Sequence, residues 1–193
     1  MKRVLFLSFL FAGLGAISAN AQYYSANDEV LGTFKAGAGY THDFPGLNGV
    51  TFLGEYSHSL YDRLEGAFAM KYIRLNGHPR SATVNEYTKS TTAEFIIYYL
   101  PMQNDNHILR VGLGYAFSFY KIRRSYPVEK TTGTEKSLTW HPQEKQGRVS
   151  GVSLIGEYQY LIPESNLSVG IRAALYRAYD RVSYFGPFVG VRL

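Results

Sequence analysis

Strict alternation of side-chain type along most of the chain is the feature that most constrains the fold. Eight segments of about ten residues carry apolar side chains at every second position, with small or polar side chains between them. This period is typical of β-strands, because successive side chains of a strand point to opposite faces of its sheet. In the clearest segment one face has Leu109, Val111, Leu113, Tyr115, Phe117 and Phe119, and the other has Arg110, Gly112, Gly114, Ala116 and Ser118. The pattern predicts an all-β fold.

The links between the predicted strands alternate in length. We expect the strands at residues 30–40, 50–57, 64–72, 92–99, 109–119, 151–160, 167–175 and 188–193. Short, turn-rich links (Leu60–Arg63, Pro101–His107 and Ile162–Asn166) follow the second, fourth and sixth strands, and longer links follow the first, third and fifth. An even number of strands with short turns at one end and longer loops at the other is typical of transmembrane barrels. We therefore expect an eight-stranded antiparallel up-and-down transmembrane β-barrel.

The first residues have the three parts of a secretory signal peptide. Lys2 and Arg3 precede an apolar run from Val4 to Ile17, and the segment closes with Ala19-Asn20-Ala21. The alternative is an uncleaved membrane anchor, but the run is shorter than the ~20 residues that a spanning helix needs. We expect a signal peptide at 1–21, a periplasmic N-terminal segment at 22–29 and the barrel at 30–193. No second long apolar run follows.

Alternation alone does not say which face of the barrel is outside. In a soluble, lipocalin-like barrel the apolar face would point inward and the charged face would meet water. Here the polar face is rich in Gly, Ala and Ser with charges of both signs, which suits a narrow interior where the charges pair. The expected lumen charge network consists of Lys35, Glu55, Glu65, Lys71, Glu94, Arg110, Glu157, Arg172 and Arg192.

Aromatic residues of the apolar face favour a membrane setting. They gather toward the ends of the strands, and two belts of amphipathic rings at the water boundaries are a membrane feature. The expected belts are Tyr40, Tyr72, Phe117 and Phe119 at the long-loop end, and Tyr56, Tyr99, Tyr158 and Tyr160 at the short-turn end. The sequence also stops within the last predicted strand, at Leu193.

Together, the signal peptide, the eight alternating segments and the final strand Phe185–Leu193 resemble the small outer-membrane β-barrel proteins of Gram-negative bacteria, of the OmpX and OmpW type. The resemblance covers Leu31–Leu193 and rests on a pattern, not on a catalytic motif. It implies insertion by the barrel-insertion machinery, for which Phe188, Val189, Val191 and Leu193 would form the signal. Members of this family commonly end in an aromatic residue, where this chain has Leu193.

The longest link is strongly basic. From Lys121 to Arg148 there are seven basic residues and three Glu, a net charge of +4. If this link faces outward, Arg123, Arg124, Lys130, Lys136 and Lys145 would meet the phosphates of lipopolysaccharide; the alternative is an ordinary solvated surface. Partial alternation also predicts that the flanking strands extend as a protruding hairpin. Its edge could add a partner's strand, although Pro127 and Pro142 would blunt that edge.

Catalysis and cofactor binding find little support. The chain has no cysteine, and it contains no phosphate loop or spaced histidine pair. Ser57-His58-Ser59 resembles the pairing that a lipid A deacylase uses, but we place it at the periplasmic end, away from the outer leaflet. We expect no enzyme activity, no cofactor and no metal. Despite a pI near 9.3, nucleic acid is a poor partner for an exported membrane protein.

The sequence therefore predicts a monomeric outer-membrane barrel whose lumen is filled by side chains. Its expected role is structural or interactive: envelope integrity, or contact with lipopolysaccharide or a surface partner through basic outer loops. The first alternative is a narrow channel for small hydrophobic solutes, although eight strands enclose only as much space as side chains fill. The second alternative is a lipid A-modifying enzyme.

Overall fold

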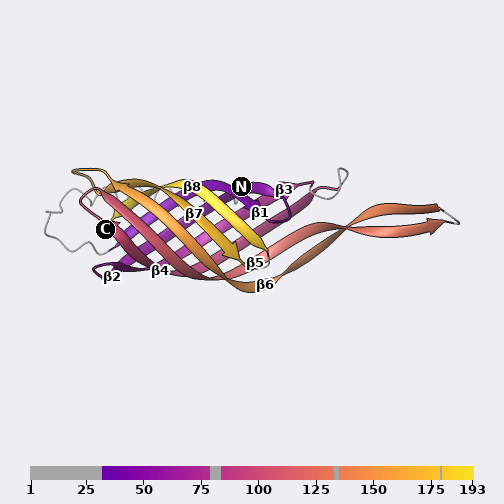
Figure 1. Cartoon of the computed structure of the whole chain (residues 1–193), viewed down its shortest axis with the longest axis horizontal. Coiled ribbons are helices and arrows are strands. Elements are labelled where there is room, and N and C mark those ends of the chain that lie inside the picture. The colour runs from indigo at the N-terminus through magenta and orange to yellow at the C-terminus, as the bar shows by residue number, and fades with distance from the viewer. Residues whose placement is uncertain (1–31, 79–83, 133–134, 179) are drawn as a thin grey trace, which may run out of the picture.

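The computed structural model forms a single closed barrel of eight antiparallel strands, each hydrogen-bonded to its neighbours in chain order (Figure 1). It describes residues 32–78, 84–132, 135–178 and 180–193, with side chains for all of these except 130–137. The strands are β1 (Thr33–Asp43), β2 (Asn48–Tyr61), β3 (Leu64–Gly77), β4 (Glu86–Gln103), β5 (His107–Thr132), β6 (Glu135–Leu161), β7 (Leu167–Arg177) and β8 (Arg181–Arg192). In these ranges no helix is long and apolar enough to cross a membrane. The expected signal peptide and segment 22–29 lie outside the described residues.

The stagger of the strands sets the shape of the barrel. Hydrogen-bonded partners followed once around the barrel lead from Thr33 on β1, through all the other strands, to Asp43, ten residues further along β1. For eight strands this stagger corresponds to a tilt of about 40° from the barrel axis, visible in Figure 1 as oblique strands. The same tilt lets strands of ordinary length cross a bilayer.

The apolar face is on the outside and the charged face is inside. Large outward side chains include Phe95 and Leu113, which are 66% and 69% exposed, whereas inward Lys35 and Arg172 are fully buried. A continuous apolar surface of this extent requires lipid to cover it, since monomeric soluble proteins do not expose one. The predicted transmembrane barrel is therefore confirmed, and the lipocalin-like alternative, which needs an apolar lining, is excluded.

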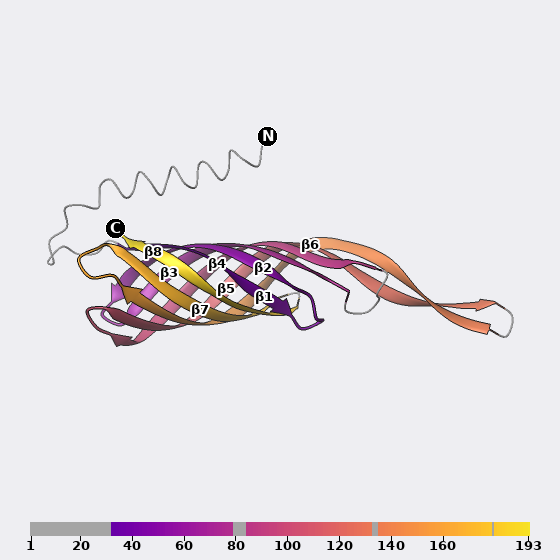
Figure 2. The same cartoon turned by 90° about the horizontal axis from the view of Figure 1, so that it is seen from above.

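β5 and β6 continue far beyond the other strands as a paired hairpin. Their ladder runs without interruption to Thr132 and Glu135, whereas the β4–β5 pairing ends at Arg123 and the β6–β7 pairing ends at Val152. Figures 1 and 2 show this hairpin projecting from one end of the barrel. The protruding hairpin expected from the alternation of residues 122–148 is present.

The link after the first strand is shorter than the sequence suggested. The first strand continues to Asp43 and the second begins at Asn48, so the link between them is a tight turn. Asp43 closes this turn by accepting the Leu47 N–H at its side chain (2.7 Å), and Gly46 has a φ of 103°, which favours glycine. At the same end, β7 ends at Arg177 and β8 begins at Arg181, so three residues lie between these two strands. The expectation of a long loop after the first strand was wrong, because both strands extend into the assumed loop: Thr41 and Asp43 continue the inward face of β1, and Thr41 pairs with Gly49 of β2.

Closure between β1 and β8 depends on glycines at the same level. Gly39 and Gly186 approach so closely that a Cβ added to Gly39 would lie 2.5 Å from the Cα of Gly186. By contrast, a Cβ added to Gly54 on β2 would meet nothing within 4 Å. The seam therefore has no room for a side chain at Gly39.

We expect Gly39→Val to weaken closure of the barrel. The added side chain forces the β1 and β8 backbones apart, and overpacking of this kind costs about 1–3 kcal/mol. The measurement is the urea midpoint of the refolded protein, together with the electrophoretic shift between unheated and boiled samples. Gly54→Val is the matched control and should leave both unchanged; equal effects of the two substitutions would contradict the seam argument.

Candidate functional site

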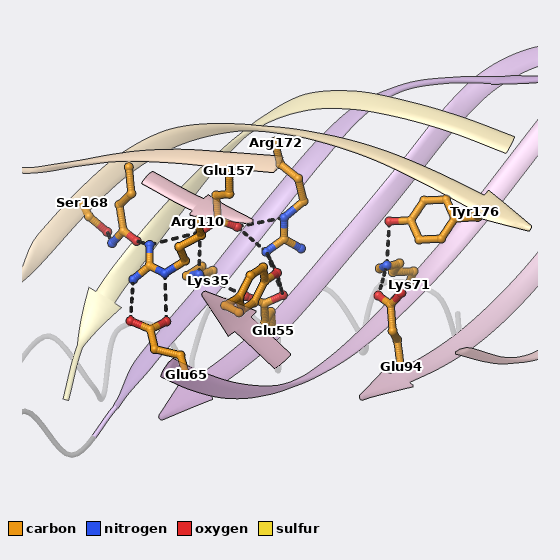
Figure 3. Close-up of polar contacts among 12 residues, drawn as sticks. Lys35, Glu55, Glu65, Lys71, Glu94, Arg110, Glu157, Ser168, Arg172 and Tyr176 are labelled. Carbon is orange, nitrogen blue, oxygen red and sulfur yellow. Dashed lines mark hydrogen bonds and ion pairs between the residues drawn. The ribbon is translucent and has the colours of Figure 1, made fainter. Parts of the chain in front are cut away.

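A plug of interacting side chains lies in the part of the lumen nearest the short turns, at the end of the barrel opposite the hairpin. All eight strands contribute to it, one or two residues each: Lys35, Glu55, Glu65, Tyr98, Arg110, Glu157, Gln159, Ser168, Arg172 and Phe188. The plug is therefore built from the whole circumference of the barrel. Figure 3 shows most of these groups converging on the barrel axis.

The centre of the plug is a four-membered ring of charges. Arg172 donates to Glu55 (2.7 Å) and to Glu157 (2.9 Å), and Lys35 donates to the same two carboxylates (3.0 and 2.6 Å). Tyr98 adds a hydrogen bond to Glu55 at 3.0 Å. Each charge therefore has two opposite charges as neighbours, which offsets the cost of removing it from water.

Arg110 extends the ring toward the rim. Its guanidinium donates two parallel hydrogen bonds to Glu65 (2.8 and 3.0 Å) and a third to Glu157 (3.2 Å). The side-chain oxygen of Gln159 accepts a hydrogen bond from Arg110, and its side-chain nitrogen donates one to the Ser168 hydroxyl (2.7 Å). The plug thus contains three cations and three carboxylates, so it carries no net charge.

A second, separate pair lies nearer the hairpin end of the barrel than the plug does, to the right of the plug in Figure 3. Lys71 donates to Glu94 and to the hydroxyl of Tyr176 (2.6 Å), and Ser153 donates to Glu94. Both charged side chains are buried. Between this pair and the outer mouth the lumen holds a cavity of about 20 Å³, hardly more than one water molecule occupies. Buried side chains thus occupy the described lumen at both levels.

Arg124 corrects one expectation about the basic loop. It was expected to face lipopolysaccharide, but its side chain turns into the mouth of the barrel and is buried. There it donates to Asp43 and Asp180, both at 2.9 Å, and lies 3.9 Å from Glu86. Acidic residues from the neighbouring strands and turns outcompete solvent for the guanidinium. Arg124 therefore connects the hairpin base to the rim.

The other four expected basic residues of this loop differ in how far their side chains are exposed. Lys145 is exposed and Arg123 is half-buried. Lys130 and Lys136 lie on the paired part of the hairpin, but their side chains fall outside the described set.

On the outer face of the hairpin, Glu144 accepts from Tyr87 (2.7 Å) and from Lys121 (2.9 Å). These two interactions hold the pKa of Glu144 below its usual range. Part of the hairpin's basic charge is thus already neutralised on this face.

Arg192 is the second correction. It was expected in the lumen network, but it donates to the Ser165 carbonyl (2.8 Å) at the β6–β7 turn, because the last strand ends at the rim. Of the expected insertion signal, Phe188 points into the lumen, whereas Val189 points outward and Leu193 is exposed. Its use in barrel insertion stays a prediction.

The expected aromatic belt residues all lie on the outer face, but outward aromatic rings are not confined to two belts. Tyr40, Tyr72, Phe117, Phe119, Tyr56, Tyr99 and Tyr158 are exposed and Tyr160 is half-buried. Phe68 and Phe95 pack together between the rims, with ring centroids 5.1 Å apart.

The Ser57-His58 pair is split by the strand. Ser57 is buried in the lumen, whereas His58 is exposed on the outer face. Adjacent strand residues point to opposite faces, so these two side chains do not form the couple that a deacylase needs. Among the described residues, no cluster of His, Cys, Asp or Glu could hold a metal ion.

Sequence reasoning missed the acidic residues at the mouth. Asp43, Glu86 and Asp180 were not among the candidates, although Asp43 continues the inward alternation of Lys35 on β1 and Glu86 continues that of Glu94 on β4. Extending the period-two pattern into the assumed loops would have found both. Asp180 belongs to a turn, where no periodicity applies.

Comparison with known proteins bears on the fold. No family model and no curated protein matches this chain. Among solved structures, the Yersinia pestis attachment invasion locus protein Ail, in complex with the heparin analogue sucrose octasulfate, is similar with a TM-score of 0.52 at 12% identity, over 84% of this chain and 97% of that chain. Neisserial surface protein A gives 0.48 at 14% (84% and 96%), and the N-terminal barrel domain of Pseudomonas aeruginosa OprF gives 0.48 at 11% (83% and 97%). The neighbours are small outer-membrane β-barrels, and they do not single out the OmpX or OmpW type.

Removing one member of the Lys71–Glu94 pair should cost more than removing both. Lys71→Met leaves Glu94 buried without its cation, for which a loss of about 3–5 kcal/mol in unfolding free energy is expected. The double substitution Lys71→Met/Glu94→Leu leaves no unpaired charge and should recover most of that loss. The denaturant midpoints of the single and the double variant measure these two losses. Substitution of an exposed lysine, Lys89→Met, is the control. Losses that simply add would contradict the pairing.

Proposed function

We propose that this protein is an outer-membrane barrel of a Gram-negative bacterium that acts by surface contact through its β5–β6 hairpin. The observation that supports this most is the contrast between a lumen closed by buried, paired charges and a hairpin that extends beyond every other strand. A barrel that conducts needs space inside it. A barrel that presents a surface element needs only a stable anchor.

The composition of the hairpin supports contact with anionic surfaces. Its basic excess begins at Lys121, directly after the run of alternating outward apolar residues of β5 that ends at Phe119. The phosphates of lipopolysaccharide lie at this level of an outer membrane and attract Arg and Lys. We infer that the hairpin contacts lipopolysaccharide or another anionic partner at the cell surface, and that the short turns face the periplasm.

The remaining parts of the proposal rest on the sequence. Export through a cleaved signal peptide at 1–21, insertion through the final strand and a monomeric state agree with one another and with the OmpX and OmpW type. The solute channel has weaker support, because buried, paired side chains from all eight strands occupy the lumen. An enzyme has weaker support too, because the Ser57-His58 pair is split.

Replacing residues 126–141 by Asn-Gly tests the proposal. Ser125 and Pro142 are paired across the hairpin, and Asn-Gly favours the two-residue turn that would join them. Because the plug and Arg124 remain, the shortened protein should keep its denaturant midpoint and its unheated mobility. The replaced segment contains two lysines and two glutamates, so the net charge does not change. At least tenfold weaker binding of rough lipopolysaccharide in vesicles is expected, because the projecting part of the hairpin, with Tyr126 and Trp140, is lost.

The control uses zwitterionic phosphatidylcholine vesicles without lipopolysaccharide as the binding target. Neither the full chain nor the shortened protein should bind to them. Unchanged binding by the shortened protein, or ion conductance of the full chain in planar bilayers, would refute the proposal.

A further inference from the structure

A groove lies between the base of the hairpin and the rim of the barrel. Its volume is about 560 Å³, within the range of small-ligand sites (~300–1,000 Å³). Residues from β5 and β6 form one wall, and Pro45 of the β1–β2 turn and Asp180 of the β7–β8 turn lie at its floor. Arg124, which is paired with Asp43 and Asp180, lies where the groove meets the lumen, and Asp180 lines both spaces.

Three aromatic residues line this groove, and they come from both strands of the hairpin. Tyr120 and Tyr126 belong to β5, and Trp140 belongs to β6. Tyr126 is 49% exposed, although it lies beyond the apolar band that lipid would cover. Flat rings with polar edges in an aqueous groove suit a ligand that has both C–H faces and hydroxyl groups.

Two cations of the groove have no carboxylate partner within the described residues. Lys145 and Arg148 are exposed and line the groove, and Arg148 lies over the ring of Phe119 at 5.1 Å. The nearby acid Asp180 is already bound to Arg124 at 2.9 Å. The groove therefore offers positive charge to a ligand, whereas its one carboxylate is occupied.

We propose that this groove binds an anionic saccharide, a short sugar chain that carries phosphate or sulfate groups. The aromatic rings would stack on sugar faces, and Lys145 and Arg148 would bind the anionic substituents, Arg148 with the fork geometry that suits such groups. This deepens the proposed surface contact by naming its ligand class, and it rests on that proposal. The ligand could be the core of lipopolysaccharide or a sulfated glycan of another cell, which share this chemistry.

Two other occupants fit the groove less well. An alkyl chain would leave Lys145 and Arg148 unpaired against an apolar surface. A peptide strand added to the hairpin would need an open edge, but Pro127 and Pro142 interrupt the N–H groups of the two edges. An acidic peptide held by charge alone is left as an outcome of the test.

Trp140 makes the test direct, because it is the only tryptophan in the chain. Its fluorescence would be followed for the full protein in phosphatidylcholine nanodiscs, on titration with a sulfated heparin hexasaccharide and with delipidated, phosphorylated lipopolysaccharide core oligosaccharide. Maltohexaose, sodium sulfate and polyglutamate are the comparison probes. A saturable change with either anionic saccharide, and weaker or no change with all three comparison probes, is expected; the stronger of the two saccharides identifies the source.

The matched variants are Lys145→Ala/Arg148→Ala and Arg74→Ala/Lys89→Ala. Both remove two positive charges, but Arg74 and Lys89 are cross-strand partners on β3 and β4, outside the groove. We expect the first to raise Kd at least tenfold and the second less than threefold, with both keeping the unheated mobility of the wild-type protein.

Equal losses in the two variants would overturn the groove as the site. Polyglutamate binding as tightly as the saccharides, or no saturable change with either saccharide, would overturn the ligand class. None of these results depends on the hairpin replacement, which tests the surface contact itself, so failure of the groove and failure of the proposed function are distinguishable.

Discussion

The structure depends on the pairing of charges in a space without bulk water. A narrow barrel whose outer face must be apolar has to place its polar residues inside, where an unpaired charge costs several kcal/mol. The protein meets this constraint with a plug in which Lys35 and Arg172 alternate with Glu55 and Glu157, and with a separate Lys71–Glu94 pair. Each group is neutral as a whole. Because the charges of the interior are paired in this way, large apolar side chains can occupy the outer face, and the paired side chains occupy the lumen.

Charge pairing also organises the outer end. Arg124 connects β5 to the β1–β2 and β7–β8 turns through Asp43 and Asp180. It therefore fixes where the hairpin leaves the barrel, and it forms the lower boundary of the groove that holds Trp140, Lys145 and Arg148. The plug, the mouth and the groove follow one another along the barrel axis. In this order the charged side chains change from buried and mutually neutralised to exposed and basic. A closed anchor with a charged surface element at one end is the architecture that the proposed function needs.

Much of the barrel could be predicted from the sequence, because one short-range rule governs it. Alternation placed the inward charges and the outward apolar residues on their faces, and eight of the nine expected lumen charges line the lumen; Arg192 differs because it lies where the last strand ends. Partner choice was beyond such a rule: nothing in the spacing shows that Arg110 and Glu65 meet across the lumen, since that depends on the stagger of ten residues around the ring. Arg124 was misplaced for a related reason. Its acidic partners belong to turns and strand ends that the pattern left in loops, and a basic run in an assumed loop was expected to face lipopolysaccharide or solvent.

The most direct measurement is paramagnetic relaxation enhancement by NMR on the wild-type protein in lipid nanodiscs, with a lipid-soluble and a water-soluble probe compared. The account predicts that the lipid-soluble probe broadens the outward methyl groups of Leu113 and Leu154, and that neither probe reaches the guanidinium protons of Arg110 and Arg172. Broadening of the Arg172 protons by the water-soluble probe would show an open, hydrated lumen. Protection of Leu113 from the lipid-soluble probe would show that the apolar face does not lie in the bilayer. Either result would contradict the central claim that buried, paired charges seal a membrane barrel.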